Sequence, residues 1–127
     1  MSLRSPLGRV LGHGAAKEGV HHWWVQRMTA LALIPLGAWF VVSLLSLPAY
    51  DHATVQAWVA QTWTALLLVL FIALSAWHSK LGVQVVIEDY VHGGAKTLCL
   101  IVSTFAHTLV AAAAIFAVLK IAFGISS

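Results

Sequence analysis

The sequence predicts an all-α membrane protein with three transmembrane helices, on the basis of composition, apolar run length and linker length. Of the 127 residues, 61% are hydrophobic and 9% are charged, too little charge to cover a soluble domain of this size. The mean hydropathy is +0.91. Three apolar runs have the roughly 20 residues that a spanning helix needs, and short polar linkers separate them.

Each apolar run has features typical of a membrane helix. The first contains Pro35 and Gly37, which membrane helices tolerate. The third has alanines at 111–114, which allow a neighbouring helix to approach closely. We expect spans at about 28–47, 55–79 and 97–121, in a membrane domain of residues 27–123 that follows an N-terminal segment of residues 1–26.

Charge predicts the orientation. Four basic residues precede the first span, none lies in the first linker, and Lys80 and Lys96 flank the second linker. The positive-inside rule then places the N-terminus and the second linker in the cytoplasm, and the C-terminus on the opposite side. The segments GVHHWWVQRM and EDYVHGG therefore meet on one membrane face.

The composition also excludes several functions. A single cysteine, Cys99, excludes an internal disulfide and a cysteine-based metal site within this chain. The net charge of +3 is small and the basic residues are scattered, so we expect no binding to nucleic acid. The first 20 residues lack the apolar core of a secretory signal, and we expect them to remain on the protein.

His78 is the main candidate for chemistry. It follows the apolar part of the second span, and neutral imidazole is a common axial ligand of haem iron. The alternative is a histidine bonded to a carbonyl group or to water. Gly82, one turn later, leaves room for a flat macrocycle or for close helix packing. Asp89 is eleven residues on and returns to nearly the same helix face at ~100° per residue.

Asp89 and Tyr90 form an acid–phenol pair at the membrane edge. A phenol donates a hydrogen bond to a carbonyl and a carboxylate relays protons, which suits a quinone head group. The alternative is solvated charge at a helix C-terminus. Arg27 is either a membrane anchor or a clamp for a carboxylate such as a haem propionate. His107, in the third span, is a rival ligand that we interpret as internally bonded, with Ser103 on its face.

The run HSKLGVQVVIEDY, from His78 to Tyr90, resembles the H-x3-G-x6-D-Y motif of the hydrophobic membrane anchor subunit of succinate dehydrogenase (respiratory complex II), a cytochrome b-type small subunit. The segment GVHHWWVQRMTA resembles the same family's approach to its first helix, where a G-V-H element leads to an arginine. The chain departs from the family pattern at His22, where some relatives carry an acid.

The resemblance implies specific roles. His78 would be an axial ligand of haem b, with the opposite ligand supplied by a companion cytochrome b subunit. Tyr90 would bond to a ubiquinone carbonyl, Asp89 would support that site, and Arg27 would lie near the haem propionates and the quinone pocket. FAD and iron–sulfur clusters would belong to partner subunits, a flavoprotein and an iron–sulfur protein.

The chain is thus expected to act as an anchor subunit of an enzyme, succinate dehydrogenase (quinone), rather than as the dehydrogenase itself. We expect a bacterial inner membrane rather than a mitochondrial one, with contacts to lipid and to the partner subunits. Two alternatives stay open. One is the anchor of a fumarate reductase, and the other is a structural or transport membrane subunit without a cofactor.

Overall fold

The computed structural model describes residues 15–125, and within that range all regular structure is helical. Three helices are long and apolar enough to cross a membrane, over Gly19–Leu45, Thr62–Tyr90 and Gly94–Ala122. The predicted all-α fold with three spans is confirmed. The four elements are α2 (Ala15–Leu45), α3 (His52–Val59), α4 (Thr62–Tyr90) and α5 (Gly94–Ala122).

The helix bounds differ from those expected from the sequence. Residues 15–26, which were expected to belong to the N-terminal segment, form the start of α2. Residues 1–14 of that segment lie outside the described residues. α2 also continues through Pro35. The expected second span, 55–79, includes part of α3, whereas α4 begins at Thr62 and continues to Tyr90. The extended backbone of Gln61, with ψ of 129°, separates those two helices.

The short helix α3 starts at a capped N-terminus. The carboxylate of Asp51 accepts hydrogen bonds from the Thr54 hydroxyl at 2.7 Å and from the Thr54 backbone N–H at 3.0 Å. A side-chain cap of this kind satisfies a backbone donor that the helix leaves free. The hydrogen bond from the Thr54 hydroxyl is the main reason why the pKa of Asp51 lies below its ordinary value.

A tight turn joins α4 to α5. α4 ends at Tyr90, and Gly93 has a φ of +66°, a conformation that glycine adopts without strain. The two helices therefore run antiparallel after a connection of three residues, Val91 to Gly93. This turn brings the start of α5 back beside the end of α4.

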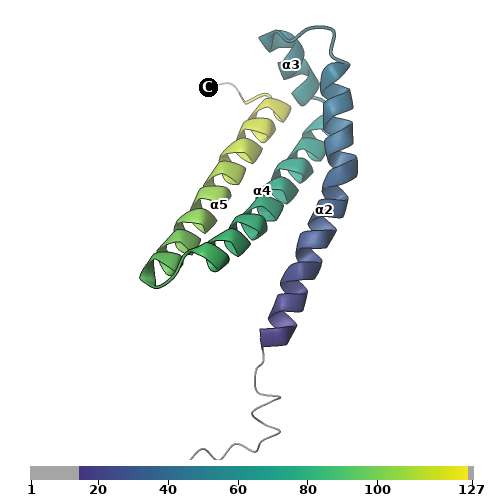
Figure 1. The fold of residues 1–127 in the computed structure, drawn as a ribbon. Coiled ribbons are helices and arrows are strands. Elements are labelled where there is room, and N and C mark those ends of the chain that lie inside the picture. Colours follow the sequence, from purple (N-terminus) through teal and green to yellow (C-terminus); the bar gives the residue numbers. More distant parts are fainter. Residues whose placement is uncertain (1–14, 126–127) are drawn as a thin grey trace, which may run out of the picture.

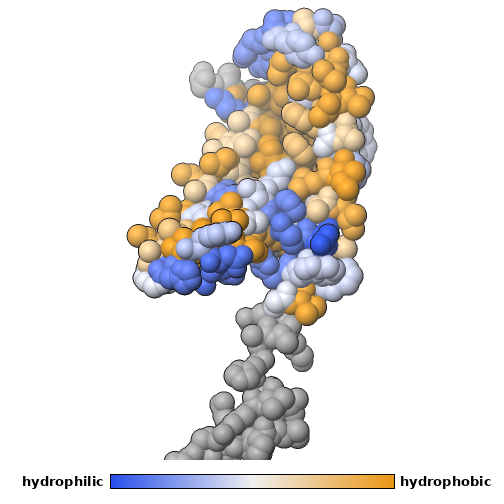
Figure 2. Space-filling model, viewed as in Figure 1, coloured by the Kyte–Doolittle hydropathy of each residue, from blue (hydrophilic) through white to orange (hydrophobic). Residues whose placement is uncertain are grey.

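The three long helices lie in a row with α4 in the middle. α4 packs against α2 on one side and against α5 on the other, and among the described residues α2 and α5 do not contact each other (Figure 1). Apolar residues form the middle of the molecule, and hydrophilic residues gather at its two ends (Figure 2). This banded surface fits a bilayer, with an apolar core between two polar interfaces.

Most buried side chains lie at the end of the molecule where α3 is found. Trp58, Val59, Ala65, Leu68 and Val118 form a cluster there. The Trp58 indole stacks on Trp39, with ring centroids 6.4 Å apart, and its N–H donates to the Ser43 hydroxyl at 2.9 Å. No described side chain is less than 2% exposed. The chain alone therefore has a small core at one end and open helix faces elsewhere.

Replacement of Trp58 tests the importance of this cluster. Trp58→Ala removes a side chain that is 8% exposed, and a buried Trp→Ala change costs about 3–5 kcal/mol. We expect a clear fall in the thermal unfolding temperature of the detergent-purified protein, followed by circular dichroism. Trp63→Ala, at a side chain that is 76% exposed, is the control. Equal effects of the two changes would contradict the assignment.

Candidate functional site at the polar end of the membrane helices

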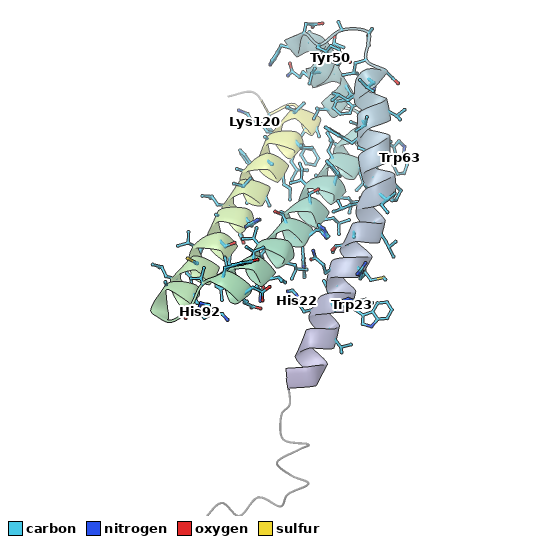
Figure 3. The ribbon with its side chains drawn as sticks, in the orientation of Figure 1. His22, Trp23, Tyr50, Trp63, His92 and Lys120 are labelled. Carbon is cyan, nitrogen blue, oxygen red and sulfur yellow. The ribbon has the colours of Figure 1, made fainter. Side chains whose placement is uncertain are left out.

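The N-terminal part of α2, the end of α4 and the start of α5 lie at the same end of the molecule. Figure 3 shows His22 and Trp23 at the same end as His92, with Tyr50 and Lys120 at the other. The two segments that charge placed on one membrane face therefore do lie at one end. We call this end, formed by residues 19–29 and 78–96, the polar end.

His78 lies near the boundary between the apolar band and the polar end. It comes sixteen residues after Thr62, or ~24 Å along the α4 axis, so it falls near the edge of a hydrocarbon core of about 30 Å. The ring is half-buried, and its Nδ1 lies 3.0 Å from the Thr29 hydroxyl on α2. From the described residues, no hydrogen bond reaches Nε2. One ring nitrogen is thus satisfied within the chain and the other is available.

A metal site made from this chain alone is not present in the described part. Within residues 15–125, no group of three or more His, Cys, Asp or Glu side chains is placed to hold a metal ion. The chemistry available at His78 is that of a single imidazole ligand. Such a ligand suits iron that is already held by a porphyrin, with a second axial ligand from elsewhere.

Gly82 faces α2 one turn beyond His78. A methyl group added at Gly82 would meet only the Gln26 side-chain amide, at 3.7 Å, which is an ordinary contact. Close packing of α2 on α4 therefore does not require glycine here. Of the two explanations for Gly82, close helix packing within this chain loses its support.

Two buried side-chain polar atoms of α2 have no hydrogen-bond partner among the described residues. They are Nε2 of His22 and Oε1 of Gln26, one helical turn apart on α2. Together with Thr29 they form a polar stripe along one face of α2, with spacings of four and three residues. Sequence reasoning missed Gln26 and Thr29 as site residues, although their spacing from His22 along one helix face was a detectable signal.

Asp89 and Tyr90 occupy the last turn of α4. The helix continues unbroken from His78, so Asp89 returns to nearly the His78 face ~16 Å further along. Both side chains are exposed, Tyr90 by 80%. The phenol and the carboxylate are free to bind a molecule at the membrane edge, but this chain does not enclose them.

The structure does not bring Arg27 to these residues. Its guanidinium lies over the Trp23 ring, 5.2 Å from the centroid, and Figure 3 shows Trp23 directed away from α4. Position 27 is ~160° around the helix from Thr29, which faces His78. Arg27 therefore points to a surface on the far side of α2, where lipid or a partner subunit would meet it.

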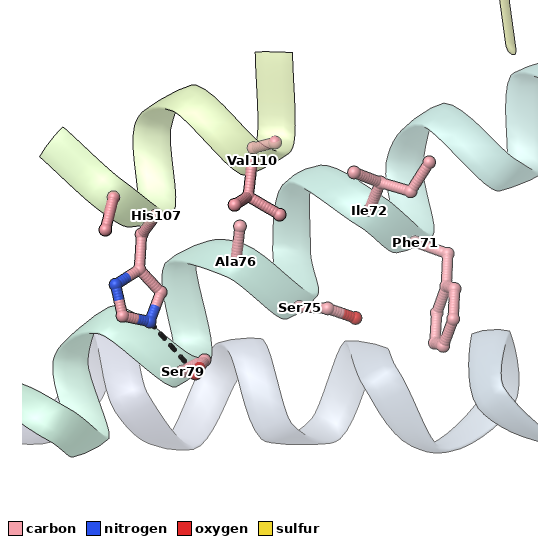
Figure 4. Close-up of a pocket in the computed structure, with 9 residues that line it drawn as sticks. Phe71, Ile72, Ser75, Ala76, Ser79, His107 and Val110 are labelled. Carbon is pink, nitrogen blue, oxygen red and sulfur yellow. Dashed lines mark hydrogen bonds between the residues drawn. The ribbon is translucent and has the colours of Figure 1, made fainter. Parts of the chain in front are cut away.

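His107 is bonded on both sides, as its internal role requires. Nδ1 donates to the Ser103 carbonyl at 2.8 Å, and Nε2 lies 3.1 Å from the Ser79 hydroxyl on α4 (Figure 4). A cavity of about 460 Å³ beside this pair is lined mostly by apolar side chains of α4 and α5. His107 thus links α4 and α5, and both of its ring nitrogens are hydrogen-bonded. His78 differs because only its Nδ1 has a partner among the described residues.

The fold and the polar end define a class of protein, namely a membrane protein with three candidate spanning helices and an exposed polar end. The family model of the succinate dehydrogenase/fumarate reductase transmembrane subunit matches residues 1–122. The chain belongs to that family.

Curated relatives agree with the family. The chain is 31% identical over 106 residues to the succinate dehydrogenase hydrophobic membrane anchor subunit of Rickettsia conorii, with 81% of this chain and 84% of that protein covered. It is 28% identical over 124 residues to the subunit of the same name from Paracoccus denitrificans, with 98% and 96% covered. A succinate dehydrogenase membrane anchor subunit of Reclinomonas americana is 33% identical over 80 residues, with 61% and 67% covered. No solved structure matches the chain.

Proposed function

We propose that this chain anchors a succinate:quinone oxidoreductase and contributes one axial ligand of haem b and part of the ubiquinone reduction site. The observation that carries the proposal is the environment of His78. Its Nδ1 is paired with buried Thr29, and its Nε2 is left available at the edge of the apolar band. When bound there, haem b would supply a one-electron carrier between the iron–sulfur subunit and the membrane.

The residues at the polar end fit a haem group. His78 supplies the nitrogen ligand, and Gly82 leaves the adjacent turn of α4 without a side chain. Arg27 lies on the opposite side of α2 from His78, over the Trp23 ring, so the arrangement of this chain does not support its predicted role as a clamp for a haem propionate. The companion cytochrome b subunit would supply the opposite ligand, because the described chain offers none.

Tyr90 and Asp89 carry the quinone part of the proposal. The Tyr90 hydroxyl would donate a hydrogen bond to a quinone carbonyl oxygen, and Asp89 would support the delivery of protons as the quinone is reduced. Their exposure at the end of α4 leaves a surface for the iron–sulfur subunit to complete. The flavoprotein would bind beyond it, so electrons would arrive on this face.

The proposed location is the cytoplasmic membrane of a bacterium, with the polar end toward the cytoplasm. Lys80, Lys96 and Arg27 belong to that end, whereas Lys120 lies at the other. The relatives from Rickettsia and Paracoccus favour a bacterial membrane. Their names also favour succinate oxidation over fumarate reduction, although the family model covers both.

Paired histidine variants test the haem ligand. In the purified complex, His78→Ala should abolish or shift the b-type α-band in a dithionite-reduced minus oxidised spectrum, because the iron loses a ligand. His107→Ala is the matched control, and its band should remain, since His107 bonds only within the chain. An unchanged band in His78→Ala would refute the assignment.

Removal of one hydroxyl tests the quinone site. Tyr90→Phe loses a hydrogen bond worth about 1–3 kcal/mol, so ubiquinone reductase activity should fall by roughly fivefold to 100-fold. Succinate oxidation with an artificial acceptor should be unchanged, because that assay bypasses the quinone. Tyr50→Phe, at the opposite end of the molecule (Figure 3), is the control variant. Equal quinone activity in both variants would exclude Tyr90.

Addition of a methyl group tests the role of Gly82. Gly82→Ala should leave the fold of this chain intact, because the added Cβ makes only an ordinary contact and Ala is the better helix former by about 1 kcal/mol. If a macrocycle lies against this turn, the haem-to-flavin ratio of the complex should fall. An unaltered ratio would remove Gly82 from the haem site.

A further inference from the structure

We propose that Thr29 is a positioning residue that selects the tautomer of His78 and aims its Nε2 out of the chain. The proposal rests on the function proposed for His78. It identifies a residue outside the H-x3-G-x6-D-Y motif that determines how His78 binds. Thr29 is one of two buried polar side chains among the described residues, at 8% exposed. Its hydroxyl lies within hydrogen-bond distance of the His78 ring.

The direction of the hydrogen bond follows from the neighbours of the hydroxyl. Thr29 Oγ1 lies 2.9 Å from the Val25 carbonyl oxygen and 3.0 Å from the Gln26 carbonyl oxygen. A hydroxyl has one proton, and a buried carbonyl is an acceptor only. The proton of Thr29 is therefore directed back to its own helix. The Thr29 hydroxyl oxygen therefore presents a lone pair to His78 and acts as a hydrogen-bond acceptor.

The ring must then donate. His78 Nδ1 is 3.0 Å from that lone pair, so Nδ1 carries the proton and Nε2 is the unprotonated nitrogen. In neutral imidazole only the unprotonated nitrogen binds a metal. A hydrogen bond at the other nitrogen also orients the ring and makes the ligand more basic. The series of hydrogen bonds from His78 to Thr29 and on to a backbone carbonyl thus leaves Nε2 unprotonated and able to bind iron.

The same contact joins two helices. Thr29 is on α2 and His78 on α4, so the orientation of the ring depends on how those helices are packed. The hydrogen bond from the Thr29 hydroxyl to the carbonyl four residues earlier fixes the position of the hydroxyl. Thr108 on α5 makes the same kind of bond to the Thr104 carbonyl. Among the described residues, the Thr108 hydroxyl makes no hydrogen bond to a histidine, and Thr108 is exposed, which makes it a matched control.

The experiment compares Thr29→Val, Thr29→Ala and Thr29→Ser in the intact complex, with Thr108→Val as control. The flavin content of the purified complex measures how much complex has assembled. Haem affinity is measured by adding haem to complex that was purified from haem-depleted cells. Loss of the hydroxyl should weaken haem binding by about 10-fold or more. It should also raise the haem midpoint potential, because a less basic ligand stabilises ferric iron less well. Thr29→Ser should restore both values, and Thr108→Val should match wild type.

The two hydroxyl-free variants separate hydrogen bonding from packing. Val keeps the volume of Thr and Ala does not, so a potential raised equally in both supports the lost hydrogen bond. If only Thr29→Ala changes the potential, Thr29 acts through packing and the inference is overturned. The inference is also overturned if both variants keep the wild-type potential and haem affinity. If His78→Ala loses its haem band while the Thr29 variants behave as wild type, the proposed function stands and this inference fails. If His78→Ala keeps its band, the proposed function itself fails.

Discussion

Every long-range contact between the membrane helices passes through α4. α2 packs on one side of it and α5 on the other, while α2 and α5 do not meet within the described chain. Three helices in a row cannot enclose a core, and even the most buried of the described residues stay 6% exposed. Membrane helices associate through close packing and hydrogen bonds rather than through hydrophobic burial. The arrangement is therefore stable only with its open faces covered by lipid or protein.

Among the described residues, three hydrogen bonds between side chains join neighbouring helices. Trp58 of α3 bonds to Ser43 of α2, His107 of α5 bonds to Ser79 of α4, and His78 of α4 bonds to Thr29 of α2. A polar side chain without a partner is costly in hydrocarbon. Each of these contacts satisfies a polar side chain and also fixes the rotation of one helix against another. His78 differs from Trp58 and His107 because one of its ring nitrogens, Nε2, has no hydrogen-bond partner among the described residues.

The unfinished polar end is consistent with a subunit of a larger assembly. Asp89 and Tyr90 extend past the apolar band, and Arg27 faces the opposite side of α2 from His78. No single enclosed pocket in the described residues brings these groups together. The buried, unpaired atoms of His22 and Gln26 lie at the same end. Membership in the transmembrane-subunit family of succinate dehydrogenase and fumarate reductase accounts for this openness, since the catalytic subunits of such enzymes are separate chains.

The sequence alone determined the number of membrane helices, because hydropathy and length decide whether a segment crosses a bilayer. It also determined that His78, Gly82 and Asp89 share a face, because helical periodicity is local, and that His107 pairs with Ser103 one turn away. Only the tertiary structure decided that α3 is separate from α4, that Arg27 turns outward and that Thr29 meets His78. The break between α3 and α4 is a local change of backbone conformation at Gln61. The direction of Arg27 and the contact of Thr29 with His78 depend on how one helix is rotated and shifted against another. Periodicity within a single helix carries no information about that rotation, which is set by contacts between residues distant in the chain.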